Sequence, residues 1–335
     1  MKKLLEPLNV PGLKLKNRLV MPPMATSKGE PDGSINQAVL DYYRERTKDG
    51  LIGLVITEHF FVRPDGQAHP RQLSAADDGK LEGLKRLAEV VNQSGSPSVL
   101  QISHAGGWTS SSRTSLPILA PSAVPHPKNA DQEVPRAMTD EDVEAVAAAF
   151  AAAAGRAKKA GFSGVELHAA HGFLLYQFFT PLLNRRQDRF GGSVQNRLRL
   201  ILDVYEAVRQ EVGGDYPILV RLGGSDYAEG GVSLSDVSAA AKRLETMGVP
   251  ILDVSGGLNG FAVPGGGDDK PGYFAPLAEA AKKEASLPVI LTGGVTTLAQ
   301  AEKLLEENKA DLIGVGRAIF HDPDWARREF ASFGR

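Results

Sequence analysis

Cysteine is absent from the 335 residues of this sequence. Disulfides, thiolate zinc sites and iron–sulfur clusters carried by this chain are therefore excluded. Apolar runs of about 18 residues, which a membrane-spanning helix needs, are absent too. Near the start of the chain, Glu6 and Pro7 follow Lys2 and Lys3 before a signal-peptide apolar region can develop. We therefore expect a cytoplasmic protein with no membrane partner.

An excess of one charge is also missing. The chain has 38 Lys and Arg against 40 Asp and Glu, a net charge of −2, which leaves no basic surface for nucleic acid. Its 42% hydrophobic and 23% charged residues are typical of a globular protein with a substantial core. We predict a single domain over residues 1–335, because α/β barrels with insertions reach this length.

Short apolar runs rich in Val, Ile and Leu recur along the chain, separated by segments with helical periodicity. The expected strands are 18–21, 52–57, 98–102, 164–167, 218–222, 251–254, 289–291 and 312–315. The clearest helix begins after Thr139, where Asp142 suggests a capping box, and stops at Gly161. Further helices are expected at 38–48, 81–91, 196–212, 236–247, 276–284 and 298–307. This alternation predicts an α/β fold, a (β/α)8 TIM barrel, with an open doubly wound sheet as the alternative.

Two stretches lie outside the repeat. Residues 1–15 are predicted to form a hairpin lid over the N-terminal end of the barrel. Residues 104–136 are rich in Ser, Gly and Pro and follow the third strand. Because loops after barrel strands lie at the catalytic mouth, this insertion is predicted to shape a substrate pocket.

The loops after strands seven and eight carry Gly293 and Gly294, then Gly316 and Arg317. Barrels often bind phosphate between these two loops. Glycines let backbone N–H groups approach phosphate oxygens, and an arginine adds charge-assisted hydrogen bonds. The pattern favours a phosphate site, although the glycines alone would also suit tight turns.

Other polar residues end the third and fifth strands. Arg221 would stabilise the negative charge that a reduced flavin carries along its N1 and C2 carbonyl edge. Gln101 can both donate to and accept from a flavin pyrimidine ring. A barrel-interior ion pair and a buried amide are the alternative interpretations of these two side chains.

His168 and His171 lie close together where the fourth strand becomes a loop. Two neutral imidazoles that donate to one substrate oxygen would stabilise the charge that develops there when hydride adds to a conjugated alkene. A structural histidine pair and a metal site are the alternatives. We expect no metal, because no spaced carboxylate–His signature accompanies the pair.

These residues belong to motifs that resemble the Old Yellow Enzyme family of FMN-dependent ene-reductases, the NADH:flavin oxidoreductases, and its thermophilic-like short-chain branch. The most specific segment is 168–172, His-Ala-Ala-His-Gly, and segments 101–106, 120–122, 184–197 and 314–317 add to it. The resemblance implies a flavoenzyme that reduces activated C=C bonds of α,β-unsaturated carbonyl substrates. NADH or NADPH would reduce FMN, leave, and be replaced by the small-molecule substrate in ping-pong order.

The resemblance also implies residue roles. His168 and His171 would bind the substrate carbonyl, and the residues implied to bind FMN are Pro23, Met24, Ala25, His59, Gln101, Arg221, Gly257, Gly293, Gly294, Gly316 and Arg317. In some relatives a C-terminal arginine enters a neighbour's active site, so Arg335 suggests a homo-oligomer. The glycine-rich run 256–272 is either a lid or a surface loop.

Two positions depart from the family pattern. Phe173 stands where the family has its tyrosine proton donor, and phenylalanine cannot donate a proton. Tyr176 is the nearest replacement, although packing of its helix is the other interpretation; Tyr273 and solvent are further candidates. Ala25 stands where this branch often has a cysteine that tunes the flavin potential.

Other functions remain as alternatives. An FMN-dependent dehydrogenase or isomerase would not need the missing tyrosine. A phosphate-binding barrel lyase would be expected to place a Schiff-base lysine at a strand end, and no lysine ends any of the expected strands. A non-catalytic flavin-binding protein is a third alternative. Fused relatives with an iron–sulfur cluster do not fit the absence of cysteine and the length of the chain.

Overall fold

The computed structural model describes residues 2–129, 131–265 and 270–333, and it contains a closed barrel of parallel strands. The barrel strands are β3 (Leu19–Met21), β4 (Leu54–Phe61), β5 (Ser98–Ser103), β8 (Gly164–Ala169), β9 (Ile218–Gly223), β10 (Leu252–Ser255), β11 (Val289–Thr292) and β12 (Leu312–Gly314). Each pairs with its neighbour in chain order, and β12 pairs with β3 to close the ring. The predicted (β/α)8 barrel is therefore confirmed, and the open sheet is wrong.

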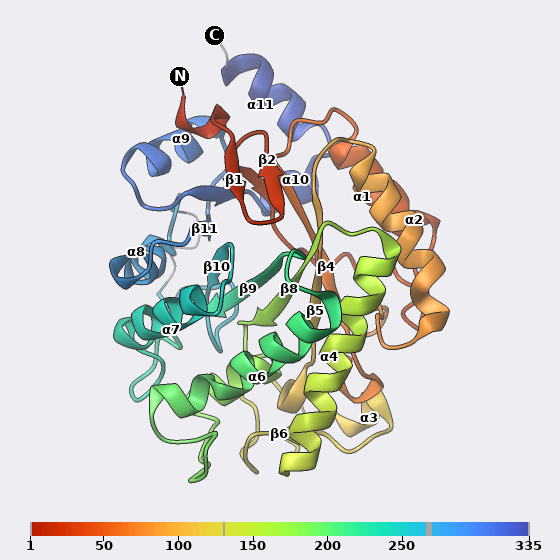
Figure 1. Cartoon of the computed structure of the whole chain (residues 1–335), viewed down its shortest axis with the longest axis vertical. Coiled ribbons are helices and arrows are strands. Elements are labelled where there is room, and N and C mark those ends of the chain that lie inside the picture. The colour runs from red at the N-terminus through yellow and green to blue at the C-terminus, as the bar shows by residue number, and fades with distance from the viewer. Residues whose placement is uncertain (1, 130, 266–269, 334–335) are drawn as a thin grey trace.

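Helices surround the barrel (Figure 1). The larger ones are α1 (Gln37–Thr47), α2 (Leu81–Asn92), α4 (Asp140–Ala160), α6 (Val194–Val212), α7 (Leu234–Thr246), α8 (Ala275–Glu284) and α9 (Leu298–Glu306). In α4, the Thr139 side chain accepts from the backbone N–H of Asp142, and the Asp142 carboxylate accepts in return from the Thr139 backbone. Gly161 ends the helix in the left-handed conformation. The capping box and the stop are thus confirmed.

Several shorter helices were not predicted. They are α3 (Ser111–Thr114), α5 (Leu174–Phe179), α10 (Arg317–His321) and α11 (Trp325–Phe333). Segments of four to six residues are too short to show a helical period. In α11, Trp325 and Ala326 are buried, and Phe330 and Phe333 pack against the core. Helix α10 is relevant to function because it begins at Arg317, one of the predicted phosphate residues.

Strand β4 runs further than its apolar sequence suggested. The expected strand 52–57 stopped before Glu58, whereas β4 continues to Phe61 with a register shift between Ile56 and His59. Such a bulge changes which side chains face the barrel interior. The polar residues Glu58 and His59 therefore belong to the strand. The predicted strand ended too early because the apolar run stops before these two residues.

The N-terminal hairpin closes one end of the barrel. Strands β1 (Leu8–Val10) and β2 (Leu13–Leu15) pair antiparallel, and the hairpin lies across the barrel in Figure 1. The two leucines of β2 pack with barrel residues Val20, Leu54, Ile56, Val99, Leu219, Ile251, Ile290 and Leu312. We call this cluster the apolar floor. The predicted hairpin is confirmed over the described residues, and it seals the floor from water.

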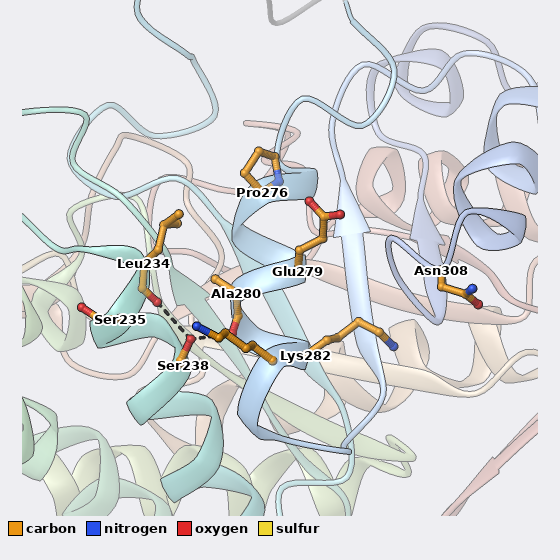
Figure 2. A pocket seen from close by; sticks show the side chains of 9 residues that line it. Leu234, Ser235, Ser238, Pro276, Glu279, Ala280, Lys282 and Asn308 are labelled. Carbon is orange, nitrogen blue, oxygen red and sulfur yellow. Dashed lines mark hydrogen bonds between the residues drawn. The ribbon is translucent and has the colours of Figure 1, made fainter.

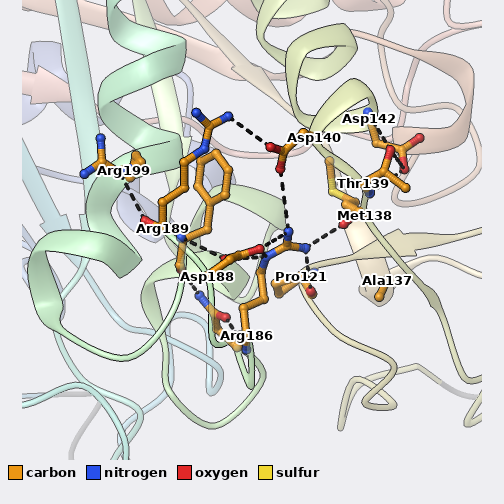
Figure 3. Close-up of polar contacts among 12 residues, drawn as sticks. Pro121, Ala137, Met138, Thr139, Asp140, Asp142, Arg186, Asp188, Arg189 and Arg199 are labelled. Carbon is orange, nitrogen blue, oxygen red and sulfur yellow. Dashed lines mark hydrogen bonds and ion pairs between the residues drawn. The ribbon is translucent and has the colours of Figure 1, made fainter.

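The insertion after β5 is anchored by Arg186, which lies in the loop after α5. It contains the pair β6 (Leu119–Ala120) and β7 (Arg136–Ala137). The guanidinium of Arg186 donates to the backbone carbonyls of Pro121, at 3.2 Å, and Met138, at 2.6 Å, and its Nε donates to Asp188 at 2.9 Å (Figure 3). Planar, multidentate donation of this kind is specific to arginine. It holds the insertion against the loop that follows α5.

A surface groove lies on the outer wall of the barrel (Figure 2). It has a volume of about 580 Å³ and runs between α7 and α8, with Leu234, Ser238, Pro276 and Ala280 in its lining. The Ser238 hydroxyl donates to the Ala280 carbonyl at 2.7 Å and joins the two helices. None of the predicted site residues lines this groove.

Among the described helices, none has the length and apolar character that crossing a bilayer requires.

Candidate active site

A polar layer lies inside the barrel directly above the apolar floor. Val99, Leu219 and Ile251 belong to the floor, and the residues two positions further along the same strands are Gln101, Arg221 and Asp253. Residues two apart on a strand face the same side, so these polar side chains point into the barrel. The predicted residues Gln101 and Arg221 are thereby brought together in one layer.

Two carboxyl groups complete this layer. Gln101 Nε2 donates to Glu166 Oε1 at 2.8 Å, and Arg221 Nε lies 3.1 Å from Asp253 Oδ2. Strand register fixes both contacts, because Gln101 pairs with Glu166 and Arg221 pairs with Asp253. Sequence reasoning missed Glu166 and Asp253. Their signal was a carboxylate within a short apolar run, two residues before His168 and Ser255 respectively.

The predicted histidine pair lies one step higher. The rings of His168 and His171 meet edge to face with centroids 5.1 Å apart. His171 Nε2 lies 2.6 Å from Ser255 Oγ, and the Ser255 hydroxyl oxygen accepts a longer contact of 3.4 Å from Arg221 Nη2. Ser255 Oγ can accept from Arg221 and also donate its own proton to His171 Nε2. When Ser255 donates in this way, the N–H of His171 lies on Nδ1.

Both histidines are neutral. Burial holds the pKa of His168 well below its ordinary value, with further contributions from His171, His59 and Arg221. Burial and the positive charge of Arg221 act on the pKa of His171 in the same direction. His168 Nδ1 has no hydrogen-bond partner among the described residues. A neutral imidazole carries one N–H, so each histidine offers a donor without adding a proton to the site.

The predicted residue His59 stands beside them. Ala68 N–H donates to Gln72 Oε1 at 2.6 Å, which turns the Gln72 amide nitrogen toward His59 Nδ1 at 2.8 Å. Nδ1 therefore accepts, and the ring proton of neutral His59 lies on Nε2. Burial lowers the pKa of His59 to about 3, with help from His69 and Arg221. His59 thus adds another fixed donor near His168; the centroids of the two rings are 5.9 Å apart.

The backbone of His171 is strained. Its φ is +57°, in the left-handed region that residues other than glycine seldom occupy. The His171 N–H donates to the Gly256 carbonyl at 3.1 Å, and Gln177 Nε2 donates to the next carbonyl, that of Gly172, at 2.7 Å. Such conformations cost about 1–3 kcal/mol and persist where surrounding contacts hold them. Here those contacts aim the imidazole at Ser255.

An aromatic wall borders the histidines. The ring of Phe173 stacks on His168, with centroids 4.5 Å apart, and meets His59 edge to face at 5.1 Å. Trp108, from the insertion, packs on the other side of Phe173 at 4.9 Å. Phe261, in the loop after β10, is 66% exposed and does not join this wall. The position of the family tyrosine is therefore an apolar surface in direct contact with His168.

Tyr176 lies in a different environment. Its hydroxyl is buried and donates to Asp226 Oδ1 at 2.7 Å. Gly257 covers that hydroxyl so closely that a Cβ at position 257 would come within 2.0 Å of it. The geometry favours the packing interpretation of Tyr176, and it explains the glycine at position 257 by the same contact.

The two glycine loops meet at the mouth of the barrel. Gly294 has φ +67°, and a Cβ there would lie 2.1 Å from the Lys270 carbonyl oxygen. Gly316 caps α10, which begins at Arg317. A Cβ at Gly316 would lie 3.5 Å from Met24 Sδ, so the end of β12 adjoins the segment after β3. The predicted phosphate residues and Met24 therefore lie around one part of the mouth.

The segment that contains Pro23, Met24 and Ala25 is held by the buried Glu58. Thr26 donates to the Glu58 carboxylate through its backbone N–H, at 3.0 Å, and through its hydroxyl, at 2.8 Å. Burial raises the pKa of Glu58 to about 7, although the two bonds from Thr26 oppose this. Pro23 and Met24 are half-buried and Ala25 is exposed. A buried carboxyl of β4 thus positions a segment at the mouth of the barrel.

Comparison with known proteins identifies the family. Residues 3–330 match the model of the NADH:flavin oxidoreductase / NADH oxidase family. The chain belongs to this family. The predicted membership in the Old Yellow Enzyme family is therefore confirmed, and with it an oxidoreductase that uses FMN and NAD(P)H.

Curated relatives of this family member include two of similar length and one that is longer. It is 39% identical over 325 residues to an NADPH dehydrogenase of Geobacillus thermodenitrificans, covering 96% of this chain and 92% of the relative. An NADPH dehydrogenase of Halalkalibacterium halodurans is 37% identical over 326 residues, with 97% and 93% covered. An NADH oxidase of Thermoanaerobacter brockii is 39% identical over 328 residues, or 94% of this chain. The chain spans about half of that NADH oxidase, 49% of its length.

Solved structures of the family have the same fold. An Old Yellow Enzyme homologue from Zymomonas mobilis superposes with a TM-score of 0.86 at 28% identity, with 98% of this chain and 92% of that chain covered. A 2-naphthoyl-CoA reductase in complex with 2-naphthoyl-CoA gives a TM-score of 0.91 at 27% identity, with 100% of this chain and 52% of that chain covered. A morphinone reductase gives 0.86 at 26% identity, with 98% and 89% covered.

The residues of this family member fit FMN. A buried hydroxyl, Thr292 Oγ1, has no hydrogen-bond partner among the described residues and lies next to Gly293 at the glycine loops. Arg221 supplies a buried cation with Nη2 near Ser255, and Gln101 supplies a buried amide in the same layer. A phosphate dianion and a polar ring edge are the groups that such donors bind. The mouth therefore offers donors for both ends of the cofactor.

Proposed function

We propose that this chain reduces activated C=C bonds of α,β-unsaturated carbonyl-type substrates, taking electrons from NADH or NADPH through FMN in ping-pong order. The observation that carries the proposal is the pair of neutral imidazoles, His168 and His171, next to the buried cation Arg221. Relatives named NADPH dehydrogenase and morphinone reductase support this type of reaction.

In this proposal the cofactor residues divide into three groups. Gly293, Gly294, Gly316 and Arg317 bind the phosphate; Gln101, Arg221 and His59 contact the ring; and Pro23, Met24 and Ala25 lie along it. FMN supplies the hydride acceptor and donor between NAD(P)H and substrate. Gly257 also makes room for Tyr176, because a side chain there would overlap the tyrosine hydroxyl, and its contact with the cofactor stays a prediction.

The histidines act on the substrate oxygen. A carbonyl gains negative charge as hydride adds to the conjugated carbon, and two pre-positioned N–H donors stabilise that charge. Burial and Arg221 keep the pKa of each imidazole low. Neither imidazole therefore takes up a second proton near pH 7, and each keeps a single N–H donor. Loss of one donor of this kind typically costs about 10²–10³-fold in rate.

The proton for the α-carbon comes from solvent in this proposal. Phe173 cannot donate, and the Tyr176 hydroxyl is committed to Asp226 beneath Gly257. The aromatic wall instead leaves water at the mouth as the proton source. An FMN-dependent dehydrogenase or isomerase is the second candidate, and the specific observation that favours it is this apolar surface in place of a phenol.

The pocket and the domain organisation extend the same proposal. Trp108 brings the insertion, residues 104–136, into contact with Phe173, so this insertion forms one wall of the substrate pocket. A single domain over residues 1–335 stays a prediction, as does a homo-oligomer. Arg335, Gly266 and Gly267 lie outside the described residues.

Anaerobic stopped-flow spectroscopy tests this function. The wild-type holoenzyme should bleach with NADPH and regain its yellow colour with a cyclic enone. We expect His168→Ala and His171→Ala to keep FMN, yet to reoxidise with the enone about 10²–10³-fold more slowly. Reoxidation by oxygen, which needs no carbonyl donors, should stay at the wild-type rate.

A surface histidine serves as the matched control. His321, at the exposed end of α10, is outside the proposed machinery, so His321→Ala should behave as wild type. A colourless protein that ignores added FMN would refute the proposal. So would enone reoxidation that neither site variant slows. Reduction of the enone in D₂O should give a saturated product with deuterium on the α-carbon. A dehydrogenase or isomerase would form no saturated product.

A further inference from the structure

The polar layer above the floor contains more negative groups than positive ones. Glu166 and Asp253 are fully buried, and Arg221 is the cation between them. Arg221 Nε lies 3.1 Å from Asp253 Oδ2, whereas Glu166 is held through Oε1 by the neutral amide of Gln101. Among the described residues, Glu166 Oε2 and both Asp253 oxygens have no hydrogen-bond partner, and what distinguishes Asp253 is its ion pair with Arg221.

Charge balance in this layer calls for a proton. The apolar floor and the hairpin exclude water from below, and an uncompensated charge in such an interior is costly. One guanidinium neutralises one carboxylate, and Asp253 is the carboxylate in direct contact with it. The second carboxyl group, Glu166, is therefore the one that holds a proton, with Oε2 as its site.

The surroundings of Glu166 agree with this assignment. Burial, and then the negative charge of Asp253, raise the pKa of Glu166 to about 8, against the opposing effects of Arg221 and Gln101. Burial also raises the pKa of Asp253, to about 6, with Arg221 opposing. The other titratable side chains at this end of the barrel, His59, His168 and His171, are neutral because their pKa values are lowered.

We propose that Glu166 is a positioning residue that stores a proton beneath the cofactor and thereby makes the redox potential of FMN depend on pH. This inference rests on the proposed function, which places Arg221 beside the ring. Hydride transfer from NAD(P)H brings two electrons and one proton to the cofactor and adds one negative charge near Arg221. With Glu166 protonated, Arg221 and Asp253 balance each other, and no further negative charge opposes reduction.

In alkaline solution the balance changes. Glu166 is then ionised in the oxidised enzyme, and the added negative charge raises its pKa on reduction. One proton from solvent binds Glu166 Oε2 as the two electrons arrive, and it is released when substrate takes the hydride away. Reduction thus takes up one proton at low pH and two at high pH, with no other bond formed or broken.

The midpoint potential of FMN in the holoenzyme, measured from pH 6 to pH 10, tests the proposal. Each proton taken up by a two-electron couple shifts the potential by about 30 mV per pH unit. The wild type should therefore change from one such slope to twice that slope in the alkaline range. Glu166→Gln, a neutral isostere of the protonated acid, should keep the single slope throughout. Its potential should equal the wild-type potential at pH 6 and exceed it at pH 10.

Asp253→Asn is the matched second variant. Removing this carboxylate lets Glu166 pair with Arg221, so the pKa of Glu166 should fall and the change in slope should move to lower pH. A merely structural role for Glu166 would shift all potentials by a constant amount. Wild-type and Glu166→Gln curves that run parallel over the whole range would overturn the proposal, as would a wild-type slope that never changes.

Infrared spectroscopy supplies a measurement that needs neither turnover nor a variant that binds FMN. At pH 6 the wild-type protein should show a carbonyl band of a protonated carboxylic acid that Glu166→Gln lacks, in addition to the band of Glu58 that both proteins share. Identical carbonyl bands in the two proteins would overturn the assignment. Failure of NADPH to bleach the wild-type holoenzyme would refute the proposed function and this inference with it. Normal bleaching with parallel curves would refute the inference alone.

Discussion

Replacing Tyr176 by phenylalanine should weaken the fold and leave alkene reduction intact. The buried carboxylate of Asp226 accepts four hydrogen bonds: from the Tyr176 hydroxyl at 2.7 Å, the Thr180 hydroxyl at 2.5 Å, and the backbone N–H groups of Val232, at 3.0 Å, and Leu258, at 3.1 Å. These donors come from α5, from the loop after β9 and from the loop after β10. Tyr176→Phe removes one donor and keeps the ring in place.

The magnitude follows from those contacts. A hydrogen bond to a charged group contributes about 1.5–3 kcal/mol, and three of the four donors remain. Unfolding entropy is about 2.1 cal/mol/K per residue, or about 0.7 kcal/mol/K for a chain of 335 residues. The melting temperature should therefore fall by about 2–4 °C. No loss of rate is expected, because the hydroxyl donates to Asp226 and lies against Gly257.

Scanning calorimetry of the FMN-saturated protein and stopped-flow reoxidation by an enone measure the two effects separately. Tyr205→Phe is the control, since Tyr205 is also buried and its hydroxyl accepts from Arg209 Nη2, at 3.1 Å, far from any predicted site residue. A hundredfold loss of alkene reduction in Tyr176→Phe, with an unchanged melting temperature, would show that Tyr176 is the proton donor and that our reasoning is wrong.

Two further substitutions test the site. Burial raises the pKa of Glu58 from 4.5 to about 7, so its contribution to stability is present below pH 4.5 and is lost, by about 3 kcal/mol, as the pH rises through 7. Urea unfolding at pH 5 and pH 8 should show this loss in the wild type and not in Glu58→Gln; an equal loss in both would exclude Glu58 as its source. Phe173→Tyr places a phenol on the wall beside His168 and should speed enone reduction, by up to about 10²–10⁴-fold where proton transfer limits the rate. The solvent isotope effect on reoxidation measures that limit, and an unchanged rate and isotope effect would show that protonation here is not limiting.

The barrel was predictable because its strands are buried on both faces. Runs such as 218–222 and 289–291 are apolar throughout, and the structure places β9 and β11 there. The long helix α4 was equally clear, since Thr139, Asp142 and Gly161 mark both of its ends locally. Where a strand contains polar residues, as β4 does at Glu58, the apolar pattern stops and the predicted boundary is wrong.

The site was predictable in part. Strand ends identified Gln101, Arg221 and His168, because barrel topology alone brings these positions to one mouth. The contacts of Tyr176 were beyond sequence reasoning, since Asp226 lies 50 residues away and meets it only through the register of β8 and β9. Nothing local in the sequence shows which way that hydroxyl points.

The buried carboxylates could have been found by a stricter reading of strand alternation. Glu166 and His168 share a strand face, and so do Asp253 and Ser255. A carboxylate on the same inward face as a predicted site residue belongs to the barrel interior, where it needs a cation or a proton.

The apolar floor links these observations. Because the hairpin residues Leu13 and Leu15 exclude water from the base of the barrel, the charges of the layer above are weakly screened. Weak screening lets Arg221 lower the pKa of His171 and lets Asp253 raise the pKa of Glu166. The imidazoles stay neutral and one carboxyl stays protonated for the same reason, so the hairpin at one end of the barrel sets the protonation states at the other.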